Sequence, residues 1–164
     1  MSSWLRPTTA DIGLRSYAAT FERLFEETSY GMQNYLIDSE SVRIIPKQVH
    51  HSSVWNVSIP LHEEMNSILL VKWLEEVLYQ DEVERKWMVE STIRITADKE
   101  TIHLQAHVLW IPSDSIKKEV EIKAVTRQDL IVMEVKPNQE ILSNWPEVPS
   151  FEGPGWFSDV VFDI

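Results

Sequence analysis

The sequence closes on the stretch Asp159–Ile164 (DVVFDI), whose β-branched and aromatic residues are typical of a β-strand. No polar tail follows this predicted strand, so the side chain of Asp163 and the α-carboxylate of Ile164 are expected side by side, in or beside a sheet. Two adjacent carboxylates repel each other and are costly to bury without a partner. The end of the sequence therefore raises the question of which positive group neutralises them.

The size and composition of the chain predict one domain, 1–164, with a substantial core. Of its 164 residues 43% are hydrophobic and seven are tryptophan, which argues against disorder. It has no cysteine, so disulfides and thiolate chemistry are excluded. The first residues, MSSWLRPTTAD, lack the apolar core of a secretory signal, and no run approaches the roughly 18 apolar residues of a membrane helix. We therefore expect a cytoplasmic protein.

The chain is strongly acidic, with 26 acidic against 15 basic residues and a formal net charge of -11. Proteins that bind nucleic acid directly usually carry a basic surface that displaces counterions from the phosphates. The longest basic run in this sequence is Lys117-Lys118, so no direct contact with nucleic acid is expected. A metal ion or a basic surface of another protein is the more natural complement to this charge.

Hydrophobic periodicity predicts the elements of the first 60 residues. Alternation predicts a strand over 12–17, and Thr20 is placed to cap a helix that runs on from Phe21 to about residue 38. Two β-rich runs within 42–60 predict a hairpin that turns at 50–53.

The second half combines a helix with several strands. Apolar residues at helical spacing predict a helix over 62–82, and the period then changes to that of strands. This order favours an α+β fold: two helices packed on a curved, mainly antiparallel multi-stranded sheet. The predicted strands cover residues 87–96, 101–110, 119–126 and 129–135, with the last two joined at Arg127-Gln128.

One segment, 137–157, is irregular and rich in proline and tryptophan. It contains four prolines and two glycines within about twenty residues. Loops longer than about 15 residues are usually functional or disordered, and the aromatic residues here argue against plain disorder. The sequence does not decide between a lid and a docking surface.

The candidate chemistry lies in carboxylates at strand ends: Asp11 before one predicted strand, and Asp163 with the Ile164 terminus after another. Oxygen ligands suit hard cations such as calcium, magnesium or manganese. From the residues alone we favour the simpler reading, in which Asp11 caps a turn and Asp163 is solvated. His103 and His107 lie four residues apart on a predicted strand, about 13 Å, which is too far to share one metal ion.

Four fragments together resemble the archease family: TTADIGLRSYAATFERLFEE, LLVKWLEEVLY, EIKAVT and the final VVFDI. They occur in the order of that family and reach both ends of the sequence. The resemblance implies a small α+β protein cofactor that is not itself an enzyme. Archeases promote guanylylation and multiple turnover of the RtcB-type RNA ligase of tRNA splicing and RNA repair, which uses GTP and manganese.

The resemblance also implies a site. It places a divalent metal ion, with calcium, magnesium or manganese as candidates, on Asp11, Asp163 and the carboxylate of Ile164. Lys123, in the KAVT fragment, is then a partner-facing or site-supporting residue. A cation bound there would neutralise the paired carboxylates at the end of the sequence.

Several residues depart from the family pattern. Thr8 stands where the family often has histidine, Ala18 where it often has glycine, and Arg127-Gln128 where it usually has Tyr-His. These departures keep a second reading open, an archease-fold interaction module with a different partner that docks through Trp145 and Trp156. A metal-dependent hydrolase at the same carboxylates is a third reading, less favoured because no general base is clearly positioned.

Overall fold

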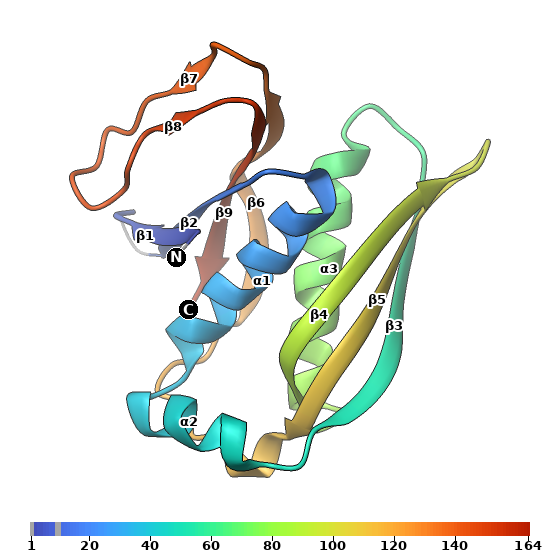
Figure 1. Cartoon of the computed structure of the whole chain (residues 1–164), viewed down its shortest axis with the longest axis vertical. Helices are drawn as coiled ribbons and strands as arrows, with labels where there is room; N and C mark the ends of the chain where they lie inside the picture. Colours follow the sequence, from blue (N-terminus) through green and yellow to red (C-terminus); the bar gives the residue numbers. More distant parts are fainter. Residues whose placement is uncertain (1, 9–10) are drawn as a thin grey trace. The chain divides into compact units, whose positions relative to one another are not determined.

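The computed structural model describes residues 2–8 and 11–164 (Figure 1). Its elements group into two compact units. The terminal unit comprises Met1–Asn34 and Ile122–Ile164, and the central unit comprises Tyr35–Glu121. The α+β fold with helices on antiparallel sheets is confirmed, although the strands form separate sheets rather than one curved sheet. That the chain is a single domain stays a prediction.

The final stretch of the sequence forms the strand β9 (Gly155–Asp163), inside the four-stranded sheet of the terminal unit. The strand order is β1 (Ser3–Arg6), β2 (Ile12–Ala18), β9 and β6 (Ala124–Val135), and every neighbouring pair is antiparallel. Six consecutive residues of β9 are buried, Phe157 to Phe162, which is the pattern of a strand covered on both faces.

The helix α1 (Phe21–Leu36) covers one face of this sheet. Thr20 caps it as predicted, because its hydroxyl accepts a hydrogen bond of 3.1 Å from the backbone N–H of Arg23. Toward the sheet, the hydroxyls of Thr28 and Ser158 lie 3.1 Å apart and are hydrogen-bonded.

The irregular segment covers the other face. Its short strands β7 (Glu140–Ile141) and β8 (Phe151–Glu152) pair with each other, and we call residues 142–150 between them the covering loop (Figure 1). The hydroxyl of Tyr17 donates to the carbonyl of Pro149 at 2.7 Å, and the ring of Tyr17 stacks on Phe151 with centroids 4.8 Å apart. The segment therefore packs on the sheet of its own unit.

A single irregular strand replaces the two strands that were predicted on either side of Arg127-Gln128. β6 runs through this point, and its register against β9 shifts between Thr126 and Ile131. Asp129 has a left-handed backbone with φ of 53°, so the extra residues are absorbed as a bulge. Residues 119–123, predicted as strand, lie outside β6.

The central unit has a three-stranded antiparallel sheet with β5 (Thr101–Pro112) between β3 (His51–Pro60) and β4 (Lys86–Ala97). The helix α3 (Met65–Glu82) packs on one face, where the rings of Trp55 and Trp73 lie 6.2 Å apart. These elements confirm the predicted helix over 62–82 and the two strands that follow it. None of the described helices is long and apolar enough to cross a membrane.

The hairpin predicted over 42–60 is wrong in its first half. Residues 39–47 form the helix α2 (Ser39–Ile44) and a 3₁₀ turn, η1 (Ile45–Lys47), and only β3 is a strand. The side chain of Asp38 accepts a hydrogen bond of 2.7 Å from the backbone N–H of Ser41, which lowers the pKa of Asp38. This N-cap satisfies a free helix N–H and outweighs the β preference of the residues that follow it.

Candidate functional site

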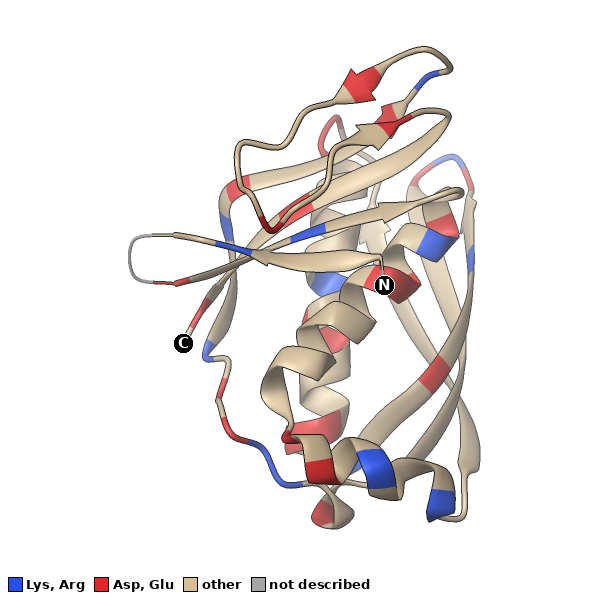
Figure 2. Ribbon diagram, turned by 60° about the vertical axis from the view of Figure 1, so that its left-hand side comes forward, with Lys and Arg blue, Asp and Glu red and all other residues tan. Residues whose placement is uncertain are grey.

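The strand register brings Asp11 and Asp163 to the same end of the terminal sheet. Ile12, the first residue of β2, faces Phe162 of β9, and continuing this antiparallel register by one residue places Asp11 beside Asp163. Partners across such a pair have Cα atoms about 5 Å apart. Figure 2 shows the C-terminus at the end of the sheet where β2 begins. Both aspartates are half-buried.

Lys123 and Ile164 lie at the same end of the sheet. Ala124 of β6 faces Asp163, and the backbone N–H of Lys123 donates a 2.8 Å hydrogen bond to the carbonyl of Asp163. The side chain of Lys123 is exposed, whereas Ile164 is half-buried. The four candidate residues are thus neighbours along the backbone ladder, drawn from three strand ends.

The backbone at Asp11 is held by Thr8, the residue that stands where the family often has histidine. The Thr8 hydroxyl accepts a hydrogen bond of 3.2 Å from the N–H of Asp11 and donates a short one to its carbonyl. A hydroxyl in this place bonds the backbone of Asp11 but offers no imidazole nitrogen.

The donors at this end fit a hard cation. Among the described residues no three His, Cys, Asp or Glu side chains gather closely enough to hold a metal ion. Two aspartates alone give an incomplete ligand set, and the role predicted for the carboxylate of Ile164 stays a prediction. Oxygen donors of this kind suit calcium, magnesium or manganese, and the metal site stays a prediction.

A buried charge cluster, absent from the sequence-based predictions, lies further along the same sheet. Arg15 of β2 faces Asp159 of β9 and donates to both of its oxygens, from Nε at 3.0 Å and from Nη2 at 2.6 Å. The hydrogen bond to Asp159 raises the pKa of the Arg15 guanidinium, against the effect of desolvation. Trp145 of the covering loop lies over this guanidinium, with its ring centroid 5.3 Å away. The only sequence signal is the charged pair within otherwise apolar strands.

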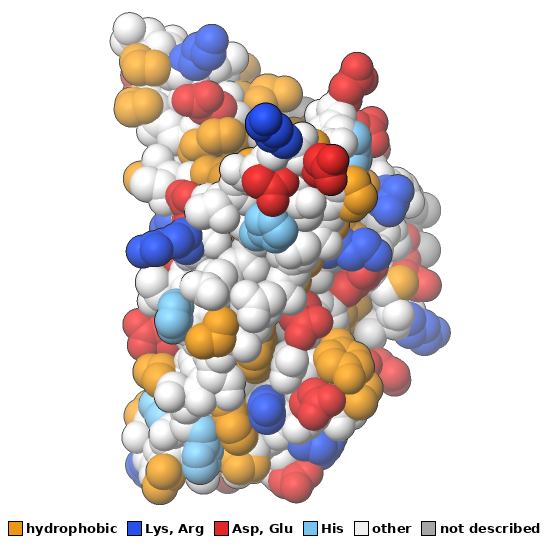
Figure 3. Space-filling model, turned by 90° about the vertical axis from the view of Figure 1, so that its right-hand side faces the viewer, with side chains coloured by type: hydrophobic (Ala, Val, Ile, Leu, Met, Phe, Trp, Pro, Cys, Tyr) orange, Lys and Arg blue, Asp and Glu red, His pale blue; other side chains and the backbone are white. Residues whose placement is uncertain are grey.

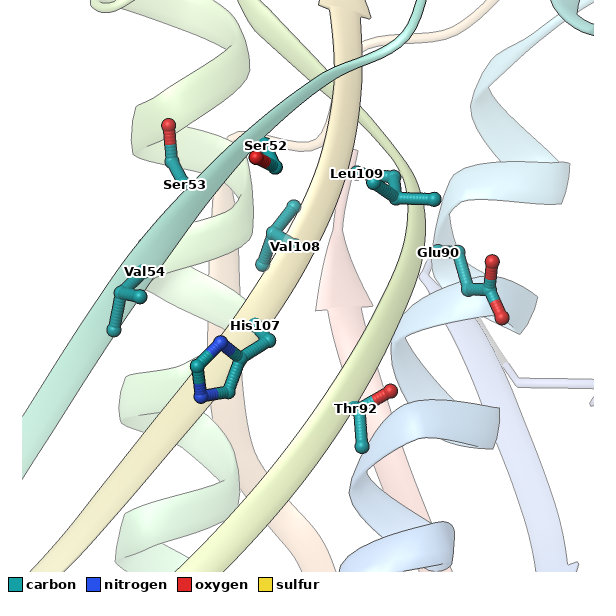
Figure 4. Close-up of a pocket in the computed structure, with 8 residues that line it drawn as sticks. All are labelled: Ser52, Ser53, Val54, Glu90, Thr92, His107, Val108 and Leu109. Atoms are coloured by element: carbon teal, nitrogen blue, oxygen red, sulfur yellow. The ribbon is translucent and has the colours of Figure 1, made fainter.

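A shallow hollow of about 420 Å³ lies on the open face of the central sheet (Figure 4). His107 stands in it beside Val54 of β3 and Thr92 of β4, its register partners on the two neighbouring strands. Histidines are spread along this side of the protein rather than gathered (Figure 3). The hollow has one imidazole and one carboxylate, Glu90, and offers no group of ligands or nucleophile with its base.

The same sheet holds a Ser-His-Asp chain that sequence spacing did not indicate. His103 Nδ1 lies 2.8 Å from the Ser58 hydroxyl, and its Nε2 lies 3.1 Å from Asp98 Oδ2. The His103 and Asp98 side chains are 44% and 62% exposed, so water screens the group and no desolvated cleft surrounds it. Asp98 also accepts from the N–H groups of Glu100 and Thr101, which makes this chain a cap of the β4–β5 turn.

The two tryptophans proposed for docking are engaged within the terminal unit. Trp145 lies over Arg15, and the Trp156 ring lies 4.7 Å from that of Phe21. Both remain half-buried rather than fully exposed. A docking role for them stays a prediction, and the structure gives each ring a packing role.

Comparison with known proteins identifies relatives over the whole sequence. The model of the Archease protein family matches residues 5–164. The protein archease of Methanosarcina mazei is 31% identical over 160 residues, covering 95% of this chain and 91% of its own. The protein archease of Thermococcus gammatolerans is 29% identical over 124 residues, covering 74% and 81%.

A solved structure shares the fold. The solution structure of protein 1598 of Methanobacterium thermoautotrophicum superposes with a TM-score of 0.59 and covers 99% of both chains. Only 17% of the residues are identical, so the likeness concerns the fold alone.

Proposed function

This chain belongs to the archease family, and on that premise we propose that it is a protein cofactor of an RtcB-type RNA ligase. In this role it promotes guanylylation and repeated turnover of the ligase and performs no catalysis of its own. The observation that carries the proposal is the meeting of Asp11, Asp163 and Lys123 at one end of the terminal sheet. The resemblance implies a metal site at Asp11, Asp163 and Ile164, with Lys123 as a partner-facing or supporting residue, and this supports the proposal.

Asp11, Asp163 and the terminal carboxylate of Ile164 would hold a divalent cation such as calcium, magnesium or manganese. A bound cation offsets the repulsion between carboxylates and fixes the strand ends relative to each other. Lys123, exposed beside them, is free to contact an acidic group of the ligase. The metal thus orders a docking surface at the end of the sheet.

The overall charge supports a protein partner. With a net charge of -11 the chain repels an RNA backbone, and attraction to a basic surface of the ligase speeds the encounter instead. We therefore assign the RNA contacts to the ligase.

The test is multiple-turnover RNA joining by the ligase of the same organism, with and without this protein. We expect turnover to rise, and Asp11→Ala and Asp163→Ala to abolish the rise. Glu134→Ala is the matched control, because it removes an exposed carboxylate from β6 of the same sheet. A ligase that is indifferent to the wild-type protein would refute the proposal and favour a different partner for the same fold.

A second measurement isolates the metal. One residue added after Ile164 moves the terminal carboxylate, so calcium or manganese binding measured by calorimetry should weaken almost as much as in Asp163→Ala. Unchanged affinity in the extended protein removes Ile164 from the ligand set. The result does not depend on the ligase.

A further inference from the structure

Arg6 is a buried guanidinium without a full set of partners. Its residue is 7% exposed, yet its closest ionic contact among the described residues is a long one, 3.4 Å from Nε to Asp159 Oδ1. That Nε is a buried donor without a hydrogen-bond partner. Burying such a donor costs free energy unless an acceptor is supplied.

The local charges do not balance. Asp159 already accepts two hydrogen bonds from Arg15, so one carboxylate serves two guanidiniums and the cluster carries one excess positive charge. Within the described part of the chain, no other carboxylate lies within 4 Å of Arg6. An excess buried charge is retained in proteins where something pairs with it.

The outer end of Arg6 has no acceptor among the described residues. Its Nη atoms make no hydrogen bond to any of them, and they are not among the buried atoms without a partner. The stem lies across Gly13, where a Cβ would come within 2.5 Å of Arg6 Cγ. The Trp145 ring lies over the guanidinium at 5.3 Å. The guanidinium thus packs against Gly13 and under Trp145, and its outer N–H donors have no acceptor among the described residues.

We propose that the Arg6 guanidinium, backed by Arg15 and covered by Trp145, is a binding site for a phosphate group. A guanidinium presents paired N–H donors that match two phosphate oxygens, and a phosphate dianion more than offsets the excess charge. Neither Asp11 nor Asp163 takes part, so the inference stands apart from the proposed metal site and from the ligase.

The experiment is a titration of the full-length protein with inorganic phosphate, at low ionic strength and with a chelator present, followed by calorimetry and by the NMR signal of the Trp145 indole N–H. We expect saturable binding. Arg6→Gln should weaken it about tenfold or more, because hydrogen bonds to a charged group are lost. Arg6→Lys keeps the charge but not the fork and should weaken it less.

The controls separate this site from general attraction. Arg94→Gln removes an exposed arginine from β4 and should leave the affinity unchanged. A nucleoside monophosphate that binds more tightly than both phosphate and its nucleoside indicates a nucleotide as the source, and equal binding to phosphate indicates the free ion.

Two results overturn the proposal. One is the absence of saturable phosphate binding by the wild-type protein, and the other is acetate binding as tight as phosphate binding. If Arg6→Lys binds phosphate as tightly as the wild type, the paired N–H donors of the guanidinium are not what binds it. This variant also keeps the test valid if Arg6→Gln fails to fold.

Discussion

The two large sheets of this protein each have a helix on one face, but they differ in what lies on the other face. The terminal sheet has α1 on one face and the covering loop on the other, and it buries Arg6, Arg15 and Asp159 under that loop. The central sheet has α3 on one face, while the other presents Ser, Thr, His, Asn and Gln side chains from β3, β4 and β5. Among the described residues of these two sheets, the buried charges lie on the face under the covering loop, where Asp159 contacts both arginines.

The largest expected effect comes from removing the counter-charge of the covered face. Asp159→Asn leaves Arg6 and Arg15 without their carboxylate, and breaking a buried ion pair in this way costs about 3–5 kcal/mol of unfolding free energy. Urea denaturation measures the loss. Glu90→Gln, on the open face, should stay within about 0.5 kcal/mol of the wild type. Similar shifts for both variants would contradict the contrast between the faces.

A smaller effect is expected from Gly13→Ala. The new Cβ would lie 2.5 Å from Arg6 Cγ, so the arginine stem must move, at a cost of about 1–3 kcal/mol for overpacking. A double-mutant cycle with Arg6→Ala checks the cause, since the cost should largely vanish when the stem is absent. Additive effects would show that Arg6 is not what Gly13 accommodates.

Removing the hydrogen bond that anchors the covering loop should lower the stability by a smaller amount. Tyr17→Phe removes the hydrogen bond to Pro149, which should cost about 1 kcal/mol and speed proteolysis within residues 142–150. Tyr79→Phe is the matched control, because its hydroxyl bonds Glu84 on an exposed helix surface and should matter less. If cleavage of the loop is unchanged in Tyr17→Phe, this hydrogen bond does not hold it.

The smallest effect concerns the open sheet and its exposed turn. The pKa of Asp98 is lowered from its ordinary 3.8 to about 2 by three hydrogen bonds. The largest contribution comes from the backbone N–H of Glu100, followed by those of the His103 side chain and the backbone N–H of Thr101. Because the folded-state pKa is depressed, the contribution of Asp98 to stability is complete above about pH 4 and is lost as the pH falls through about 2.

Titration of the Asp98 carboxyl by NMR checks this directly. In His103→Ala the pKa of Asp98 should rise part of the way, because one of its three hydrogen bonds is lost. Asp98→Asn should flatten the acid limb of the stability profile between those pH values. An unaltered titration in His103→Ala would show that the imidazole does not contribute.

The same contrast explains what could be predicted. β4 and β5 have one open face, so their alternation is visible in sequence. Both α1 and α3 show helical spacing, and Thr20 caps α1. The helix α2 was missed because one side-chain hydrogen bond at Asp38 decided it. The bulge in β6 was missed because its left-handed residue is Asp129 rather than glycine.

Part of the candidate site could likewise be predicted from the sequence, and part could not. Asp11 and Asp163 were candidates from the residues, the family resemblance implied one metal site for them, and the register of β2 and β9 places the two residues side by side despite their separation in sequence. The cluster around Arg6 was not predicted, because it depends on a strand pairing and on a loop packing over it. Hydrophobic periodicity shows which face of a helix or strand is buried. It does not show which charged residue, distant in sequence, lies opposite on the neighbouring strand.

The place of β9 in the strand order has a consequence for biosynthesis. Every strand partner within the central unit is encoded between residues 35 and 121, so that unit can assemble while translation continues. β2 pairs with β9, more than 130 residues later in the sequence, so this edge of β2 has no strand partner until β9 has been synthesised. During that interval the unpaired edge of β2 can pair with other strands.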